Sequence, residues 1–458
     1  MAGKISAFFG AQDMTRGNPA SNLIRFSVPL LIGNLAQQLY STVDSIVVGQ
    51  YVGDGALAAI GASGPILNLL LVLFMGVSVG ASIMVSQYFG AKDKKRLSDS
   101  VGTAITATVV SSAFITAIGP LVTGWSMSLL QTPADIYDMA CDYLAILLLG
   151  IVGSAFYNIL SGILRGLGDS VMPLLFLIIA CGLNVVLDIW FVASFRMGVA
   201  GAAWATIISQ AVSGALCLIR LLLMRDILHV RLRSLWPSRE LLSQLVRLGL
   251  PSGLTQAIFS MAMIVVQSLT NSFGTTIIAV STVVMRVDGF AMMPNFTFGT
   301  AMTTFTGQNI GAKRLDRVEK GTKDGMKIGL VVSVILVAMI LLFGRYLVEM
   351  FTSTPDVIRL SVHMMQILAV GYVAMAVTQI LSGVMRGAGD TMTPMWISMI
   401  TTIVIRVPIA YGLAAWLQSP DALFISMLVS WVMGAVLTVL AYRMGRWKRK
   451  SVISREAV

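Results

Sequence analysis

Long apolar segments separated by short polar connections dominate the pattern of this chain. We count twelve segments rich in apolar residues, each long enough as a helix to cross the roughly 30 Å hydrocarbon layer of a bilayer. Their predicted bounds are 25–49, 56–88, 100–124, 139–163, 171–195, 199–224, 250–272, 276–308, 327–347, 360–385, 394–417 and 422–443. The pattern predicts an all-α integral membrane protein with twelve transmembrane helices.

The second half of the chain repeats the first. Residues 161–173 read SGILRGLGDSVMP, and residues 382–394, at an offset of 221, read SGVMRGAGDTMTP. The same offset relates QYFGAK at 87–92 to QNIGAK at 308–313. Two motifs with one spacing indicate a duplicated half rather than a repeated short motif. Because each half has an even number of spans, both have the same orientation in the membrane.

The longest polar connection divides the chain between these halves. We predict an N-terminal six-helix lobe at 1–224, a cytoplasmic linker at 225–248, a C-terminal six-helix lobe at 249–443 and a basic cytoplasmic tail at 444–458. A duplicated membrane half is typical of secondary transporters, in which one lobe rocks against the other.

Composition supports the membrane assignment. Hydrophobic residues make up 56% of the chain and charged residues 12%, and the mean hydropathy is +0.84, too apolar for a soluble protein. The net charge of +11 does not indicate a nucleic-acid partner, because 27 of the 32 Lys and Arg residues lie in the N-terminus, the even-to-odd loops and the tail. That placement follows the positive-inside rule and predicts a multi-pass protein of the cell membrane with both termini in the cytoplasm.

The residues that carry enzyme chemistry are scarce. The three cysteines are scattered in apolar context and fit neither a disulfide framework nor a metal motif. His229 and His363 are the only histidines, and no nucleophile–base pair accompanies them. We therefore expect a protein that is not an enzyme and has no cofactor.

A polar stripe follows one face of the first span. Its members are three or four residues apart, so they share one face of the helix, and this polar face is not expected to contact lipid. They are Asn34, Gln37, Gln38, Ser41 and Asp44.

A second polar group lies at a similar predicted depth. Asp188 and Asn184 are one turn apart on the fifth span, and Thr206 follows on the sixth. With Asp44, these side chains would surround a small hard cation such as sodium. Two neighbouring carboxylates would also share a proton, so the residues leave sodium and proton coupling both open. The alternative is that these groups only hold helices together by hydrogen bonds.

The second half lacks this acidic group, since the position 221 residues after Asp188 is Ile409. Ion handling is therefore predicted in the first half. In the second half, Asp288 shares its span with Arg286, which lies roughly opposite on the helix, and Arg406 is a candidate to neutralise Asp288. A structural ion pair and a role in substrate or proton handling both remain open for this group.

Two further patterns have simpler interpretations. On span 7, Gln256 begins a polar stripe with Ser260 and Gln267 that we expect to face the substrate cavity. The repeated Gly-x-Gly-Asp turn is expected to be structural, with glycines ending one helix and Asp169 or Asp390 capping the next.

With the paired QxxGAK and RGxGD motifs, the first-span Asp44 and the Asn184–Asp188–Thr206 set, the chain resembles the multidrug and toxic compound extrusion (MATE) family over nearly its whole length. The resemblance implies a V-shaped cavity between two lobes and monomeric antiport of organic cations or drugs against sodium ions or protons by alternating access. It also implies that Asn184, Asp188 and Thr206 form the cation site of DinF-like members, and that Tyr40 and Asn158 line the drug cavity.

The chain departs from the family at two points. The span-7 region around Phe259 and Ser260 lacks the glutamate of members with a second-lobe coupling site, and Ile189 stands where a proline often follows the aspartate. A flippase for a lipid-linked oligosaccharide or another amphipathic lipid precursor is the alternative function. Such a protein is expected to carry several basic residues in its cavity, and only Arg286 and Arg406 offer them.

Overall fold

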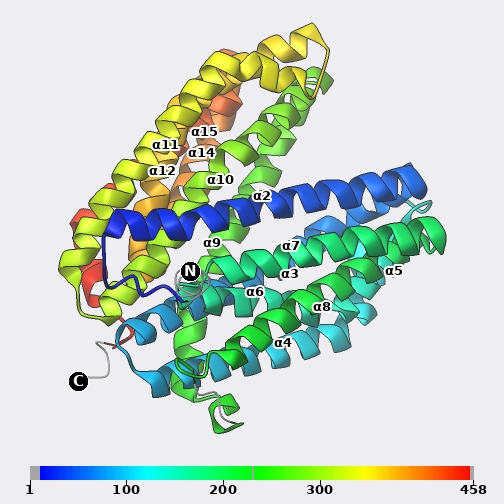
Figure 1. The fold of residues 1–458 in the computed structure, drawn as a ribbon. Coiled ribbons are helices and arrows are strands. Elements are labelled where there is room, and N and C mark those ends of the chain that lie inside the picture. The colour runs from blue at the N-terminus through cyan, green and yellow to red at the C-terminus, as the bar shows by residue number, and fades with distance from the viewer. Residues whose placement is uncertain (1–10, 229–231, 454–458) are drawn as a thin grey trace, which may run out of the picture. The chain divides into compact units, whose positions relative to one another are not determined.

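The computed structural model describes residues 11–228 and 232–453, apart from the side chains of Ser41, Asp44, Ser45, Asp54, Leu57, Leu232 and Arg233 (Figure 1). Every regular element within these ranges is helical. The first half contains α2 (Pro19–Tyr51), α3 (Asp54–Gly90), α4 (Lys94–Leu129), α5 (Tyr137–Leu149), α6 (Ile151–Gly166), α7 (Val171–Asp188), η1 (Ile189–Ser194) and α8 (Gly198–Leu223). The second contains η2 (Leu232–Leu235), α9 (Arg239–Ser272), α10 (Thr275–Gly311), α11 (Leu315–Glu349), α12 (Pro355–Gly387), α13 (Met392–Met399), η3 (Ile400–Ile405), α14 (Arg406–Leu417), α15 (Asp421–Arg443) and η4 (Arg446–Arg449).

The helices match the predicted spans and extend beyond most of them. Ten of the described helices are long and apolar enough to cross a membrane, or eleven if the bent pair α5 and α6 forms one span. The axes of α5 and α6 differ in direction by 50° at the break between Leu149 and Ile151, within the segment 139–163 that was predicted as a single span. The first predicted span corresponds to α2, which is 33 residues long and carries the polar stripe. The all-α membrane class is therefore confirmed.

The described chain folds as two compact units. Among the described residues, the first unit holds 11–13 and Val28–Gly253, and the second holds Met14–Ser27 and the residues from Leu254 onward. The long helices α2 and α9 each begin in one unit and continue in the other. Moreover, α9 begins at Arg239, inside the segment 225–248 that the sequence suggested as a linker.

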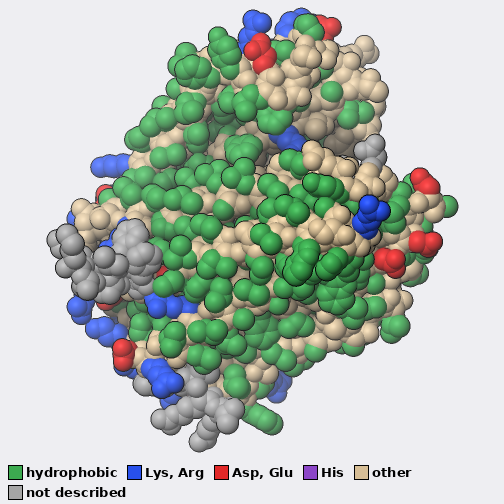
Figure 2. Space-filling model, turned by 45° about the vertical axis from the view of Figure 1, so that its right-hand side comes forward, with side chains coloured by type: hydrophobic (Ala, Val, Ile, Leu, Met, Phe, Trp, Pro, Cys, Tyr) green, Lys and Arg blue, Asp and Glu red, His purple; other side chains and the backbone are tan. Residues whose placement is uncertain are grey.

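Each unit is a bundle of packed helices. In Figure 1, α3 to α8 run side by side in the first unit, and α10, α11, α12, α14 and α15 in the second. The largest buried cluster of the second unit surrounds Tyr372 and Trp431, whose rings lie 5.8 Å apart. Large apolar side chains remain exposed on the outside of both bundles; Leu121 is 81% and Leu342 is 73% exposed. Such side chains are stable in contact with lipid, and Figure 2 shows them spread over much of the visible face.

The duplication recurs in the geometry of the turns. Lys92 after α3 and Lys313 after α10 both adopt the left-handed conformation, with φ of 58° and 57°. In both turns the preceding alanine N–H donates to the carbonyl oxygen of the motif glutamine, Gln87 or Gln308. The repeated QxxGAK motif therefore ends two equivalent helices in the same way.

Glycines of the other repeated motif lie where helices cross at close range. A Cβ atom on Gly162 of α6 would lie 2.2 Å from Ser78 Oγ, and one on Gly383 of α12 would lie 2.3 Å from the carbonyl oxygen of Gly299. The next turn repeats this, since Gly166 and Gly387 closely approach the carbonyl oxygens of Ser82 and Thr303. Small residues let membrane helices pack backbone to backbone. This close contact accounts for the two glycines, Gly162 and Gly166 or Gly383 and Gly387, that both halves have.

A comparable crossing joins α3 to the start of α9 inside the first unit. Cβ atoms on Gly76 and Gly80 would lie 2.7–2.8 Å from backbone atoms of Gly249, Gly253 and Leu245. The spacing of four residues within each helix gives both a GxxxG face.

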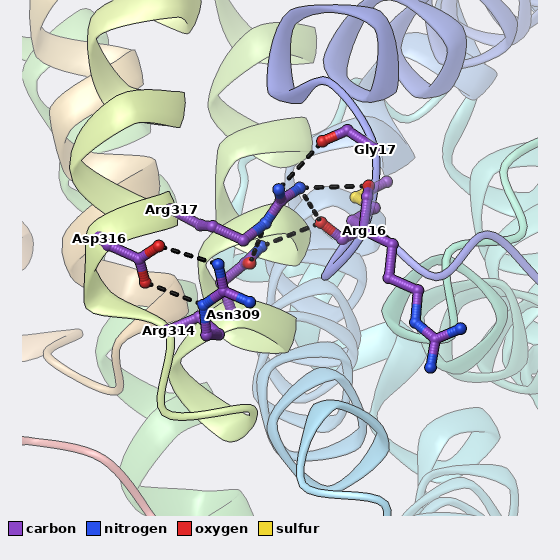
Figure 3. Close-up of polar contacts among 7 residues, drawn as sticks. Arg16, Gly17, Asn309, Arg314, Asp316 and Arg317 are labelled. Carbon is purple, nitrogen blue, oxygen red and sulfur yellow. Dashed lines mark hydrogen bonds and ion pairs between the residues drawn. The ribbon is translucent and has the colours of Figure 1, made fainter.

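The segment before α2 is bound to the second unit by side chains of α10 and α11 (Figure 3). Arg317 is the centre of this contact, because its guanidinium group donates to three backbone carbonyl groups. Its acceptors are the carbonyl oxygens of Met14 (3.1 Å), Arg16 (3.1 Å) and Gly17 (2.9 Å). Arg317 also donates to Asn309 Oδ1 at 3.1 Å, and the Asn309 amide donates to the Met14 carbonyl oxygen at 3.2 Å. The Met14 N–H in turn donates to Gln308 Oε1 at 2.8 Å. We call Met14–Gly17 the N-terminal strap.

Candidate ion-coupling and substrate sites

Three residues predicted to bind the coupling ion meet between α7 and α8. With the Asn184 amide oriented to satisfy both of its neighbours, its nitrogen donates to Asp188 Oδ2 at 2.8 Å and its oxygen accepts from the Thr206 N–H at 3.2 Å. Asn184 and Asp188 are completely buried. The Asn184 bond therefore holds one carboxylate oxygen of Asp188 in place.

The backbone changes its helical form directly after this carboxylate. Asp188 is the last residue of α7, and the π-helix η1 starts at Ile189, where the family often has proline. Short π-helical segments widen the turn and are frequent at functional sites. Here the π-helix interrupts the regular α-helical geometry at Ile189 without a proline.

The fourth predicted ligand cannot be placed at this site. The side chains of Asp44 and Ser41 lie outside the described residues, although both belong to α2. Among the residues that are described, no three His, Cys, Asp or Glu side chains gather closely enough to hold a metal ion. The described part of the site therefore consists of one carboxylate, one amide and Thr206.

The other polar residues of α2 are accessible rather than buried. Gln37 is exposed and Tyr40 is half-buried. Amide side chains on a membrane helix avoid lipid, so an exposed stripe of them indicates a water-filled space. Asn158 is half-buried on α6, where its amide nitrogen donates to the Ser154 carbonyl oxygen at 2.8 Å.

The charged group of the second unit differs from the prediction. The buried Asp288 accepts a hydrogen bond from the Tyr372 hydroxyl group of α12, and it makes no direct ion pair with Arg406. Arg406 is itself buried at the start of α14, where one guanidinium nitrogen lies 3.5 Å from Met427 Sδ and its Nε has no hydrogen-bond partner. Of the two roles left open for this group, a direct ion pair between Asp288 and Arg406 is therefore not present in the structure. Arg406 contributes only a longer-range attraction.

Two other predicted residues of the second unit, Arg286 and Gln256, are exposed, unlike the buried Asp288. Arg286 is exposed whereas Asp288 is buried, as their spacing on α10 suggested. Gln256 is exposed on α9, and its carbonyl oxygen accepts a hydrogen bond from Ser260 at 3.3 Å.

Tyr372 is the residue that sequence reasoning missed. A second buried contact supports the same helix, because Asn295 of α10 donates to the Tyr372 carbonyl oxygen at 3.2 Å and accepts from Ser333 of α11 at 3.0 Å. A tyrosine within an apolar span gives little signal by itself. The carboxyl group of Asp288 within an apolar span was the only signal in the sequence, because such a group needs a hydrogen-bond donor nearby.

The repeated Gly-x-Gly-Asp turn has the structural role that the sequence suggested. Gly168 and Gly389 have left-handed φ values of 87° and 97°. Asp169 accepts from the Met172 N–H at 3.1 Å and Asp390 from the Thr393 N–H at 3.3 Å. Burial raises the pKa of Asp169. The Met172 N–H and the nearby Arg220 guanidinium group favour the charged carboxylate and so oppose this rise.

A duplicated bundle of membrane-spanning helices is typical of membrane transporters. The MatE family model matches this chain twice, over residues 29–190 and 251–412. The protein therefore belongs to the MATE family of multidrug efflux transporters, which are membrane transporters and not enzymes.

Individual relatives match the chain over almost its whole length. "Probable multidrug resistance protein YpnP" of Bacillus subtilis is 32% identical over 97% of this chain and 100% of its own. "Probable multidrug resistance protein NorM" of Thermotoga maritima is 26% identical, with 95% of each chain covered.

Solved structures show the same fold. An outward-facing multidrug resistance MATE transporter of the MOP superfamily superimposes with a TM-score of 0.89 at 28% identity, covering 95% of this chain and 97% of its own. A MOP superfamily transporter from Pyrococcus furiosus, for which a reversed polarity of the binding pocket is described as suggesting a different function, gives 0.89 at 27% identity over 96% and 98%.

Proposed function

We propose that this protein exports organic cations in exchange for sodium ions or protons, and that Asp188 carries the coupling ion. The observation that supports this most is the meeting of Asn184, Asp188 and Thr206 from two helices at a buried position of the first unit. The ion is a transported substrate of the exchange.

A buried carboxylate explains why an ion would bind here. An aspartate at membrane depth costs about 2.5–3.5 kcal/mol on insertion scales. A bound proton or sodium ion removes that penalty, while the hydrogen bond from Asn184 keeps Asp188 correctly oriented. Asp44 of α2 is proposed as the second carboxylate of the site.

The polar stripe of α2 is proposed as the substrate-contacting surface. Gln37 provides amide groups and Tyr40 an aromatic face, which attracts organic cations. Asn158 and Ser41 are proposed to extend this surface, and Gln256 is proposed as a substrate contact of the second unit. Because α2 also carries Asp44, ion binding would change the position of the helix that contacts the drug.

Coupling follows if the ion and the drug favour different shapes of the first unit. Ion binding draws α2 toward α7 and α8, and Pro29 gives α2 a point at which to bend. Each ligand then weakens binding of the other. The driving energy suffices, since a potential of about 100 mV supplies about 2.3 kcal/mol for each net charge moved.

The test is ethidium transport by purified protein in liposomes, with sodium and proton gradients imposed separately. The wild-type protein should respond to at least one gradient, and Asp188→Asn should lose that response. Asp138→Asn is the matched control, because it makes the same change at an exposed position of α5. Gradient-driven transport by Asp188→Asn at the wild-type rate would exclude Asp188 as the coupling residue.

Equilibrium binding distinguishes the competitive mechanism from transport alone. Raising the concentration of the coupling ion should weaken ethidium binding to the wild-type protein, and Asp188→Asn should reduce this effect. Transport of a lipid-linked sugar without ethidium binding would instead favour the flippase function.

A further inference from the structure

A cavity on the basic end of the second unit has the chemistry of a phospholipid site. Its volume is about 580 Å³, within the roughly 300–1,000 Å³ typical of ligand pockets. It lies between the start of α11, the last turns of α12, the end of α15 and η4.

The charge of its lining is strongly unbalanced. Four cationic side chains line the cavity, namely Lys323, Lys327, Arg443 and Lys448, against the single carboxylate of Glu319. Glu319 is already paired with Lys448 at 2.7 Å. Among the described residues, no ion pair or side-chain hydrogen bond involves the other three cations.

The spacing of two of these cations adds to the argument. Lys323 and Lys327 are one turn apart on the same face of α11, and both are exposed. Like charges at this spacing destabilise an isolated helix by about 0.2–0.5 kcal/mol. An anion bound between the two ammonium groups would attract both and outweigh their mutual repulsion.

Much of the remaining lining is apolar. Leu381 and Trp447 are buried, and Trp447 stacks on Tyr442 with ring centroids 5.3 Å apart while its indole N–H donates to the Tyr442 carbonyl oxygen. Met326 completes the apolar surface between the two lysines of α11. An aromatic pair beside cations is typical of the level at which headgroups meet acyl chains.

We propose that this cavity binds the headgroup of an anionic phospholipid, with its phosphate between Lys323, Lys327 and Arg443 and its glycerol and first acyl carbons against Leu381 and Trp447. Basic pockets between membrane helices bind lipids of this class. A free phosphate ion would satisfy the cations but would leave the apolar surface unused.

The test uses full-length, delipidated protein in detergent. Native mass spectrometry would compare binding of phosphatidylglycerol, phosphatidylcholine and inorganic phosphate at equal concentrations. We expect preferential retention of phosphatidylglycerol, and a loss of about 25-fold in its affinity in Lys323→Gln/Lys327→Gln, which corresponds to about 1 kcal/mol for each lysine.

The matched control is Lys320→Gln/Arg446→Gln, which removes two exposed cations from α11 and η4 that do not line the cavity. Equal losses in both double variants would mean diffuse surface attraction and would overturn the proposal. Equal binding of both lipids, or displacement of phosphatidylglycerol by phosphate at the same concentration, would also overturn it. Because the lysines are exposed, a shared melting temperature would show that folding is intact.

Discussion

At the scale of single residues, the buried pair of Asp288 and Tyr372 shows how a membrane bundle accommodates a carboxyl group. The Tyr372 ring packs against Trp431 in the core of the second unit, so its hydroxyl group is held in place. The pair links α10 to α12 through a hydrogen bond between two buried side chains. Its role is therefore expected to be mainly structural.

Tyr372→Phe should destabilise the protein by about 1–3 kcal/mol, because it leaves the buried Asp288 without its hydroxyl donor. Thermal unfolding in detergent would measure the change. Tyr411→Phe is the control, since its half-exposed hydroxyl group makes only a 3.3 Å bond to the Val265 carbonyl oxygen. Adding Asp288→Asn to Tyr372→Phe should cost less than the two separate changes combined. Strict additivity would contradict the pairing.

The residues of the candidate ion site were accessible to sequence reasoning, whereas Tyr372 was not. Asn184 and Asp188 are polar residues at helical spacing within an apolar span, so they stand out against their surroundings. Thr206 was found through its estimated depth, and the structure places its backbone N–H against Asn184. The partner of Asp288 depends on how α10 and α12 are rotated about their axes, which composition and spacing do not determine.

At the scale of helices, close backbone contact explains the repeated glycines. The approach of α12 to α10 at Gly383 has the same geometry as the approach of α6 to α3 at Gly162. The motif was visible in the sequence, but the helix that it contacts was not. A repeat reveals which positions are constrained, and only the packed bundle shows what constrains them.

Gly383→Ala should destabilise the protein by at least about 1–3 kcal/mol, because the new methyl group would meet the carbonyl group of Gly299 and force the helices apart. Gly412→Ala on α14 is the matched control, since nothing lies within 4 Å of a Cβ atom there. That control should be neutral or slightly stabilising, given the higher helix propensity of alanine. Folded yield and thermal unfolding in detergent would report both changes. Equal melting temperatures would refute the close crossing.

The N-terminal strap is a second feature that belongs to the scale of elements. Arg317→Gln should release it, because three hydrogen bonds to backbone carbonyl groups are lost together. Hydrogen exchange at residues 14–17 should then become faster by roughly tenfold or more, as expected when about 1.4 kcal/mol or more of local stability is lost.

Arg314→Gln is the control for the strap, as Figure 3 makes clear. Arg314 is three residues before Arg317, but its guanidinium group pairs with Asp316 at 2.9 Å and does not bond to the strap. Faster exchange in both variants would show that loss of surface charge, rather than loss of the Arg317 contacts, releases the segment.

At the scale of the whole molecule, the distribution of charge predicts the orientation in the membrane. In the sequence, basic residues precede α2 and follow α15, and by the positive-inside rule they predict that both ends of the chain are cytoplasmic. A C-terminal green fluorescent protein fusion should therefore fluoresce, and a C-terminal alkaline phosphatase fusion should be inactive. The opposite pair of results would contradict this orientation.

The class of fold was predictable at this scale because apolar length and an internal repeat are properties of the chain itself. The bend at Gly150 and the π-helices η1 and η3 were not, because each depends on packing against neighbouring helices. The division into units was also hidden from the sequence. A linker between two halves suggests that each half folds on its own residues, yet the structure groups residues 14–27 with the second unit and residues 239–253 with the first.

This exchange bears on the origin of the chain. If a gene for one half was copied and fused, the same exchange would have joined two separate copies of that half, each giving the start of its first helix to the other, as α2 and α9 do here. On this hypothesis the ancestor was a pair of chains, and fusion made the exchange permanent. Fragments 1–228 and 229–458 made alone would each lack a helix start that belongs to their bundle, so the two are expected to yield a transporter only when one cell synthesises both.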